Sequence, residues 1–273
     1  MRGFQKTKFF LHRITSSLRD YPDFIILGNS FCAKTLLYNY LAQHKLILKN
    51  IFEESAFFVD YYEKGPNWYR SNFPSQMRKS LLKKKYGKMP LVGETINLPY
   101  REIPERVHKL IPNLKIIVIL RDPIERAFAS YSSLVKKEIE VLSFEEAISK
   151  KIDRWHDVNQ KLTENKIEGL EDKVSSYLSN SIYIDDIKNW TRFFPKEKML
   201  FLKSEDLFEK PIKIVNDALS FLQLKPLEKL NDYSKKEIKL ESINSDIKEE
   251  LKKFFKPHNK RLDEFLGVDM GWD

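Results

Sequence analysis

The strongest constraint on the fold is a short apolar run, FIIL at residues 24–27, which stops at Gly28 and is followed by a helical pattern from Lys34. An uninterrupted run of this length, with β-branched members, is typical of a strand that is covered on both faces of a parallel sheet. A strand, a glycine turn and a helix in this order predict the first β–loop–α unit of an α/β protein.

Two later segments repeat this order. The run IIVIL at residues 116–120 precedes a helical pattern at 123–136, and MLFL at residues 199–202 precedes one at 211–222. Because crossovers between parallel strands are right-handed, the repeated units predict an α/β fold with a central, mostly parallel sheet flanked by helices. Ligands of such sheets bind beyond the carboxyl ends of the strands, so the loops at those ends are the first candidates for a site.

The loop after the first strand has the features of an anion site. Residues 28–35 read GNSFCAKT, one glycine short of the phosphate-loop pattern G-x4-G-K-[ST], with Ala33 in place of the second glycine. Backbone N–H groups at a helix start and the positive end of the helix dipole attract phosphate. We therefore expect a phosphate-bearing ligand here. An ordinary strand–turn–helix connection that contains a lysine is the alternative.

Composition excludes several classes of protein. The net charge of +9 fits anionic partners such as nucleotides, acidic sugars or an acidic membrane surface, but no nucleic-acid-binding module is recognisable, so we expect no nucleic-acid partner. Cys32 is the one cysteine, which excludes an internal disulfide and fits a reducing compartment such as the cytoplasm. The five histidines lack zinc-site spacing, and no metal is expected. No apolar stretch reaches the roughly 20 residues of a transmembrane helix.

The chain reads as one main domain with a short leading segment. Residues 1–20 are basic and mildly amphipathic and predict a leading helix, and residues 21–273 predict a single domain. Helices are expected within 143–193 and over 246–266. Residues 230–245 are lysine-rich and lack periodicity, which predicts a long loop.

A second phosphate candidate follows the strand at residues 116–120. Arg121 comes directly after this strand, and Asp122 and Pro123 begin the next helix. Arginine can bind a phosphate through two parallel hydrogen bonds, and its charge is permanent. Since parallel strands end at the same sheet edge, we expect Arg121 and the first loop to contribute to one site.

These two segments, taken with several others, resemble the carbohydrate sulfotransferases of the heparan-sulfate type. The first loop resembles that family's PDF-[LI]-I-I-G-x-x-K-G-G-T-T-x-L-Y-x-Y-L, and residues 115–131 resemble K-[LI]-I-x-[IL]-L-R-[ND]-P-[VI]-[ED]-R-A-[FY]-S-x-Y. The further matches follow in the same order along the chain: EESAFF at 53–58, GPNWYRSNFP at 65–74, GETINLPY at 93–100, SIYIDDIKNWTRFFPKEKMLFLKSEDL at 181–207 and KFFKPHNKRLDEFLGVDMGWD at 253–273.

The resemblance implies a P-loop-like three-layer fold and in-line transfer of a sulfuryl group from 3′-phosphoadenosine-5′-phosphosulfate (PAPS) to a hydroxyl or amine of a glycan or glycolipid. It implies that Glu54 is the base that takes the acceptor's proton and that a lysine neutralises the leaving phosphate, a role that we expect Lys34 to take. The donor would be held by the first loop, by Arg121, and by the serine position of the second motif. Those residues are Gly28, Asn29, Ser30, Phe31, Cys32, Ala33, Lys34, Thr35, Leu36, Arg121, Ala129 and Ser130.

The departures from the family pattern fall at these functional positions. The family's loop lysine corresponds to Phe31, its paired glycines to Cys32 and Ala33, and its first threonine to Lys34. The serine expected at the 3′-phosphate corresponds to Ala129. The family's late glycine–lysine loop is unrecognisable, with three lysines, Lys235, Lys236 and Lys239, in roughly its place.

Three hypotheses therefore stay open. In the first, Lys34 replaces the missing lysine from the helix start, and the chain is an active sulfotransferase. In the second, the scaffold has lost its chemistry and persists as a nucleotide- or glycan-binding protein. In the third, the Ala33-Lys34-Thr35 ending belongs to a phosphate-loop kinase or ATPase, which would need an acidic magnesium ligand such as Asp122 at the end of a second strand.

Overall fold

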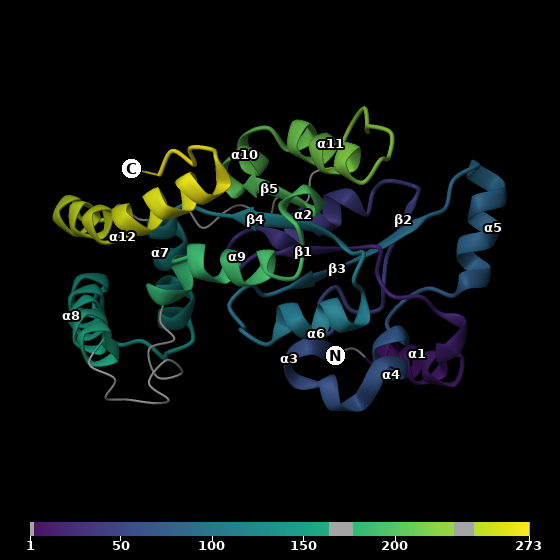
Figure 1. Ribbon diagram of the computed structural model, residues 1–273, viewed down its shortest axis with the longest axis horizontal. Helices are drawn as coiled ribbons and strands as arrows, with labels where there is room; N and C mark the ends of the chain where they lie inside the picture. The colour runs from purple at the N-terminus through teal and green to yellow at the C-terminus, as the bar shows by residue number, and fades with distance from the viewer. Residues whose placement is uncertain (1–2, 164–176, 232–242, 273) are drawn as a thin grey trace. The chain divides into compact units, whose positions relative to one another are not determined.

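The computed structural model describes residues 3–163, 177–231 and 243–272. Its centre is a five-stranded sheet with the strand order β2-β3-β1-β4-β5, in which every neighbouring pair is parallel (Figure 1). The strands are β1 (Phe24–Leu27), β2 (Ile47–Leu48), β3 (Leu91–Ile96), β4 (Lys115–Leu120) and β5 (Met199–Lys203). The predicted α/β fold with a parallel sheet is confirmed. The three predicted strands are β1, β4 and β5, whereas β2 and β3 were not predicted.

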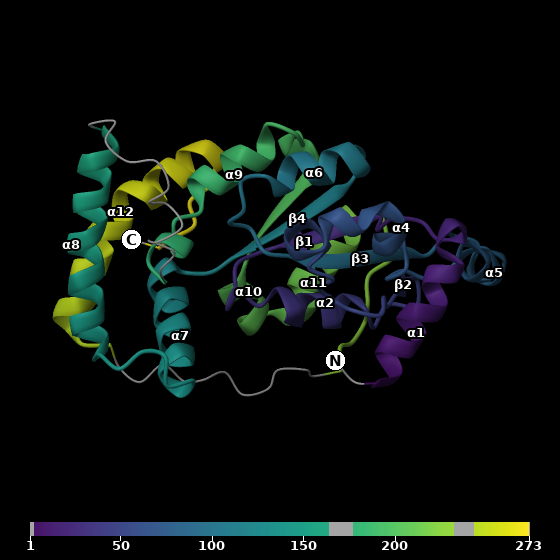
Figure 2. The same cartoon turned by 90° about the horizontal axis from the view of Figure 1, so that it is seen from below.

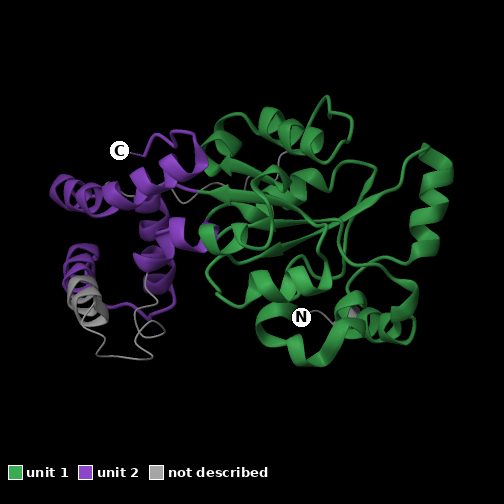
Figure 3. Ribbon diagram, in the orientation of Figure 1, with its two compact units in different colours: residues 1–28, 32–120, 188–235 green, residues 29–31, 121–187, 236–273 purple. Residues whose placement is uncertain are grey.

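The chain divides into two compact units (Figure 3). Unit 1 comprises Met1–Gly28, Cys32–Leu120 and Lys188–Lys235, and it contains the whole sheet. Unit 2 comprises Asn29–Phe31, Arg121–Ile187 and Lys236–Asp273. Each unit is described by itself below. A single domain over residues 21–273 stays a prediction.

In unit 1, helices cover both faces of the sheet (Figure 2). Helices α2 (Lys34–Leu41), α10 (Ser204–Glu209) and α11 (Pro211–Phe221) lie on one face, and α6 (Ile103–Leu110) lies on the other. The first face is built from alternate residues of the central strands, and its core cluster includes Phe24, Ile26, Ile117 and Ile119 together with side chains of α2 and α11. The strands β1 and β4 are buried on both faces, which explains their uninterrupted apolar sequence.

The further helices described in unit 1 are α1 (Gly3–Ile14), η1 (Ser16–Leu18), α3 (Phe57–Asp60), η2 (Tyr62–Lys64), α4 (Gly65–Arg70), α5 (Gln76–Tyr86) and η5 (Lys196–Lys198). An aromatic cluster joins α3 to α4, where the rings of Phe57 and Tyr69 stack at 4.5 Å between centroids. The leading helix predicted within residues 1–20 is α1.

Unit 2 is helical. It contains α7 (Pro123–Lys136), α8 (Phe144–Thr163), η4 (Ser179–Ser181) and α12 (Ser245–Leu266), and α9 (Ile184–Thr191) begins in it and ends in unit 1. The predicted helices at 123–136 and 246–266 are confirmed. Most of the loop predicted at 230–245, including Lys235, Lys236 and Lys239, lies outside the described residues.

No helix in the described parts of the chain is both long and apolar enough to cross a membrane. Across those same residues, no group of three His, Cys, Asp or Glu side chains is placed to hold a metal ion.

Candidate functional site

The start of the first loop explains why residue 28 is a glycine. A Cβ atom at Gly28 would lie 2.7 Å from the carbonyl oxygen of Ile119 on the neighbouring strand β4, which is closer than real Cβ atoms come. The loop then passes through two left-handed residues, Phe31 at φ 73° and Ala33 at φ 60°. Ala33 occupies the second glycine position of the phosphate-loop pattern, and its backbone has the conformation that glycine adopts without strain.

Helix α2 begins directly after this loop. The first hydrogen bond of the helix runs from the Leu37 N–H to the Ala33 carbonyl at 3.0 Å, so the N–H groups of Lys34, Thr35 and Leu36 precede the hydrogen-bonded ladder. The hydroxyl of Ser204, at the start of α10, lies 2.8 Å from the Cys32 carbonyl and 2.9 Å from the Leu120 carbonyl. In unit 1, the first loop is therefore anchored beside the end of β4, as the parallel sheet predicts.

Lys34 and Glu54, the two residues expected to carry the chemistry, lie in direct contact in unit 1. The Lys34 Nζ is 3.1 Å from the Glu54 Oε2. Asn97, just after β3, bonds both partners: its Oδ1 accepts from the Lys34 Nζ, and its Nδ2 donates to the Glu54 Oε1 at 2.7 Å. Lys34 is only 7% exposed, whereas the Glu54 side chain is 37% exposed. The arrangement gives one buried cation and one carboxylate that solvent or a substrate can reach.

Strand β3 holds the backbone on both sides of Glu54. The Thr95 N–H donates to the Glu53 carbonyl at 2.9 Å, and the Ser55 N–H donates to the Glu94 Oε1 at 2.8 Å. Since both neighbours of Glu54 are bonded to consecutive residues of one strand, the direction in which the Glu54 side chain leaves the backbone is fixed by the sheet.

Glu94 is a fully buried carboxyl group, at 1% exposure. Its second oxygen, Oε2, accepts from the Tyr69 hydroxyl at 2.5 Å. Burial raises the pKa of Glu94 from 4.5 to about 7, with the nearby Glu54 adding to the rise and the hydrogen bonds from Ser55 and Tyr69 opposing it. Glu94 is too buried to reach a substrate, and its hydrogen bond from the Ser55 N–H holds the backbone next to Glu54.

The raised pKa of Glu94 makes a prediction about stability. The folded state holds the proton more tightly than the unfolded state, so the free energy of unfolding falls as pH rises from about 4.5 to about 7. The amide in Glu94→Gln cannot ionise, so this variant does not lose stability in this way as pH rises. We expect the stability of this variant relative to the parent protein to rise by about 2–3 kcal/mol between pH 5 and pH 8, as measured by urea denaturation at each pH.

Glu105→Gln is the matched control. Glu105 is exposed, and the hydrogen bond and charge of Lys109 lower its pKa below 4.5, so the stability difference of Glu105→Gln should stay nearly constant between pH 5 and pH 8. A Glu94→Gln stability difference that stays constant between the two pH values would show that Glu94 is already ionised throughout this range.

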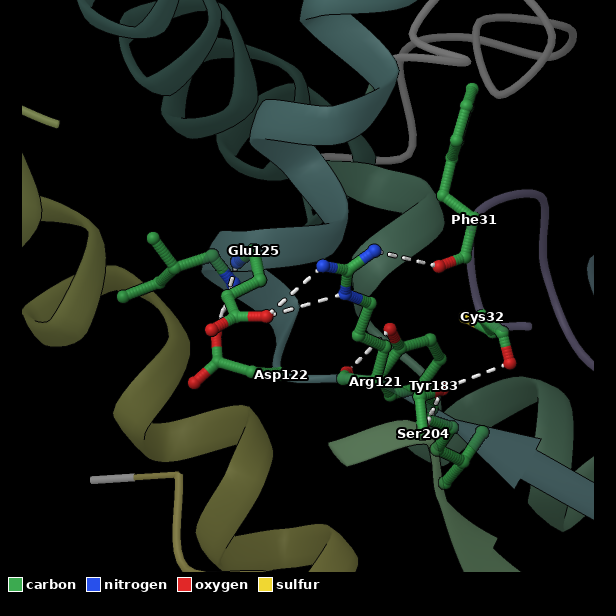
Figure 4. A network of polar contacts seen from close by, with 9 residues as sticks. Phe31, Cys32, Arg121, Asp122, Glu125, Tyr183 and Ser204 are labelled. Carbon is green, nitrogen blue, oxygen red and sulfur yellow. Dashed lines mark hydrogen bonds and ion pairs between the residues drawn. The ribbon is translucent and has the colours of Figure 1, made fainter. Parts of the chain in front are cut away.

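In unit 2, Arg121 contacts Phe31 of the first loop (Figure 4). Its Nη1 donates to the Phe31 carbonyl at 3.2 Å, while Nε and Nη2 donate to the Glu125 Oε2 at 3.3 and 3.1 Å. The Arg121 carbonyl accepts from the Tyr183 hydroxyl at 2.8 Å. The guanidinium is thus held between a backbone carbonyl and a carboxylate, and Glu125 occupies the two nitrogens that a phosphate would bind side-on.

Asp122 has a structural role. Its Oδ1 caps helix α7 by accepting from the N–H groups of Ile124 at 2.8 Å and Glu125 at 3.0 Å, and burial raises its pKa. A carboxylate whose oxygen is bound to two backbone N–H groups has less capacity for a magnesium ion. This geometry weakens the kinase hypothesis, which relied on Asp122.

A second buried arginine was missed by the sequence reasoning. Arg126 is 3% exposed and donates to the carbonyls of Ser30 and Tyr177, at 3.2 and 2.9 Å. Asn29 is also buried, and its Nδ2 donates to the Asn180 carbonyl. Residues 29–31 of the loop are therefore anchored within unit 2 by side chains. An arginine five residues after Arg121 was the available signal for this anchor.

Among the described residues, the serine position of the second motif shows no comparable side-chain hydrogen bond. Ala129 and Ser130 lie on α7, and both are half-buried. Phe31, at the family's lysine position, is 36% exposed and uses only its carbonyl in the contact with Arg121.

Comparison with known proteins identifies sulfotransferases as relatives of this chain. The family model described as "Sulfotransferase domain" matches residues 21–269. Heparan sulfate glucosamine 3-O-sulfotransferase 3B1 of Homo sapiens is 26% identical over 282 residues, which cover 94% of this chain and 66% of that protein. The bifunctional heparan sulfate N-deacetylase/N-sulfotransferase of Drosophila melanogaster is 25% identical over 236 residues, which cover 82% of this chain and 22% of that protein.

Among solved structures, a sulfotransferase from Alicyclobacillus acidocaldarius superposes with a TM-score of 0.67 at 25% identity and covers 92% of this chain and 98% of its own. The chain spans about two thirds of the length of the human and mouse heparan sulfate 3-O-sulfotransferases 3B1 and of human 3-O-sulfotransferase 3A1. The resemblance seen in the motifs is confirmed by these matches.

Proposed function

This chain belongs to the family of PAPS-dependent sulfotransferases, and from that membership and the site we propose that it transfers a sulfuryl group from PAPS to a hydroxyl or amine of a glycan or glycolipid. The observation that carries the proposal is the contact between Lys34 and Glu54, which places a buried cation next to an accessible carboxylate. The glycan class of the acceptor is supported by the heparan sulfate sulfotransferases among the relatives.

The proposed reaction has one displacement step. The acceptor oxygen or nitrogen forms a bond to sulfur while the bond from sulfur to the bridging phosphate oxygen breaks. Glu54 takes the acceptor's proton, and Lys34 stabilises the negative charge that builds on the leaving phosphate. An acceptor hydroxyl reaches Glu54 from its exposed side and replaces Lys34 as its hydrogen-bonding partner, which frees the ammonium for the phosphate.

The donor would be held at its two charged ends. At the 5′ end we assign Lys34, Thr35 and the backbone of residues 28–36, because the N–H groups at the start of α2 precede the helical ladder. At the 3′-phosphate we assign Arg121, with Ser130 as a further hydrogen-bonding group. Glu125 must then move from Arg121 when phosphate binds, since the two anions compete for the same nitrogens.

A binding protein without catalysis is the second candidate, and a specific observation favours it. Phe31 stands where the family has its lysine, and its exposed ring cannot stabilise an anion. If Lys34 does not act on the leaving group, the chain binds the nucleotide and releases it unchanged. The variants in the Discussion separate the two cases.

Calorimetry with 3′-phosphoadenosine-5′-phosphate tests donor binding. We expect binding that is the same with magnesium and with a chelator and is stronger than binding of ATP. Arg121→Ala should raise the Kd by about 10- to 100-fold, because a charge-assisted hydrogen-bonded contact contributes about 1.5–3 kcal/mol. Glu125→Gln should lower the Kd several-fold, because it removes the competing charge.

Glu146→Gln is the control, because it also removes one negative charge. Glu146 bonds to Ser143 at the start of α8, whereas Arg121 pairs with Glu125. Thermal melting of each variant checks that the fold is kept. Magnesium-dependent binding of ATP that exceeds binding of the bisphosphate would favour the kinase hypothesis instead.

A further inference from the structure

The positive charge of this protein is concentrated in two segments of unit 1. Residues 1–19 contain five lysines and arginines, residues 75–89 contain six, and neither segment contains an aspartate or glutamate. These eleven positive charges exceed the net charge of +9, so the rest of the chain is slightly acidic. The segments form α1 with η1 and α5.

The same helices expose large apolar side chains. Six of them are between 57% and 73% exposed: Phe10, Leu11, Ile14, Leu18, Met77 and Leu81. Phe10 and Ile14 are four residues apart on α1, and Met77 and Leu81 are four apart on α5, so each pair lies on one side of its helix. Exposed basic residues accompany them: Lys8, Arg13, Arg78, Lys83, Lys84, Lys85 and Lys88.

The two helices are joined to each other and to the body of unit 1. Arg19, just after η1, forms an antiparallel bridge with Ser75, just before α5, and Gln76 donates to Asp20 at 2.7 Å. Phe9 packs its ring against that of Trp68, with 5.0 Å between the ring centroids, and lies about 100° around α1 from the exposed Phe10. Both views place α1 and α5 at the same end of unit 1 (Figures 1 and 2). The exposed apolar residues are therefore on helices already packed through another side.

We propose that α1, η1 and α5 form a docking surface for a membrane rich in anionic lipid. Apolar side chains of α1 and α5 would enter the boundary between headgroups and acyl chains, and the neighbouring lysines and arginines would contact the lipid phosphates. A soluble polyanion would use the charges but leave the apolar residues in water. A second copy of this surface would bring its seven exposed basic residues against the same seven, so charge opposes that pairing.

Flotation of the full chain with lipid vesicles tests the proposal without reference to sulfuryl transfer. We expect binding to phosphatidylcholine vesicles that contain phosphatidylserine as about a third of the lipid, and little binding to phosphatidylcholine alone. Raising the salt concentration should weaken the binding, because exposed charges are screened.

Two pairs of variants separate the apolar and charged parts. Phe10→Ser with Ile14→Ser should lower the partition coefficient at least about tenfold. Lys84→Gln with Lys85→Gln should lower it by roughly 10- to 30-fold, since each basic residue near an anionic surface contributes about a factor of five. All four residues are exposed, so the fold should be kept.

The matched controls lie elsewhere on the surface: Ile139→Ser with Val141→Ser for the apolar pair, and Lys225→Gln with Lys229→Gln for the charged pair. We expect both to bind vesicles as the parent protein does. Equal loss in the controls would reduce the effect to bulk charge and hydrophobicity and overturn the proposal.

Two further outcomes would also overturn it. If the apolar variants bind vesicles normally while the basic variants lose binding to both vesicles and a dissolved sulfated polysaccharide, the surface is a polyanion site. If sedimentation shows a dimer that Phe10→Ser with Ile14→Ser dissociates, the occupant is a second copy of the chain.

Discussion

Glu54→Gln is expected to lower the kcat of sulfuryl transfer by about 100- to 10,000-fold, because the amide cannot accept the acceptor's proton. Glutamine has nearly the shape of glutamate. In the parent protein the Asn97 Nδ2 donates to the Glu54 Oε1, and the amide oxygen of the glutamine can accept the same hydrogen bond. Donor affinity should therefore change little. The measurement is the steady-state rate with labelled PAPS, together with calorimetry of 3′-phosphoadenosine-5′-phosphate.

The neighbouring glutamate gives a matched control. Glu53 uses its backbone carbonyl to hold Thr95, a contact that Glu53→Gln leaves in place. We expect Glu53→Gln to keep its kcat within about twofold, since a substitution outside the reacting groups has small effects. Equal rates for the parent protein and Glu54→Gln would remove Glu54 from the mechanism.

Lys34→Met is expected to lower kcat by about 100- to 1,000-fold, the usual cost of removing one preorganised group that stabilises charge in the transition state. It should also weaken donor binding. Methionine keeps much of the side-chain volume, so the buried position is filled. The variant also leaves Glu54 and Asn97 bonded to each other. If kcat falls by a larger factor than donor affinity does, Lys34 stabilises the leaving group in the transition state and does not only bind the donor.

The family pattern supplies a rescue for this variant. Phe31 is partly exposed at the position where the family has its lysine. Adding Phe31→Lys to Lys34→Met should recover part of the lost kcat if the cation is what the reaction lacks. Phe31→Leu in the same background is the control and should recover nothing. Recovery by both would show that the loop conformation, and not the charge, limits the rate.

The central strands could be predicted because burial on both faces leaves an unbroken apolar sequence in β1 and β4. Strand β3 was missed for a physical reason. Its sequence LVGETI contains Gly93, where a Cβ atom would lie 2.3 Å from the Phe24 ring, and Glu94, a carboxyl group buried against Tyr69 and Ser55. Close packing and a long-range polar contact thus replaced the apolar residues on which the prediction of strands depends.

The candidate site was predicted unevenly. Lys34 and Arg121 could be located from local pattern, because each follows a buried strand and stands at or just before a helix start. Glu54 was predicted from the family resemblance, because a Glu-Glu pair before an aromatic run does not by itself indicate a catalytic base. Asn97 could not be found, because its contacts with Lys34 and Glu54 depend on β3 lying between β2 and β1.

The neighbours of Arg121 show the same division. Glu125 lies four residues after Arg121, in the first turn of α7, so their ion pair is a local contact. The contact with the Phe31 carbonyl joins residues 90 positions apart and requires the folded chain.

The most direct test of the whole account is transfer of labelled sulfate from PAPS to a panel of glycans and glycolipids, with the Lys34→Met and Glu54→Gln proteins run beside the parent. An active sulfotransferase predicts a labelled product with the parent protein alone, formed only when an acceptor is present and without added metal. Tight binding of 3′-phosphoadenosine-5′-phosphate with no labelled product from any acceptor would contradict catalysis and leave a nucleotide-binding protein.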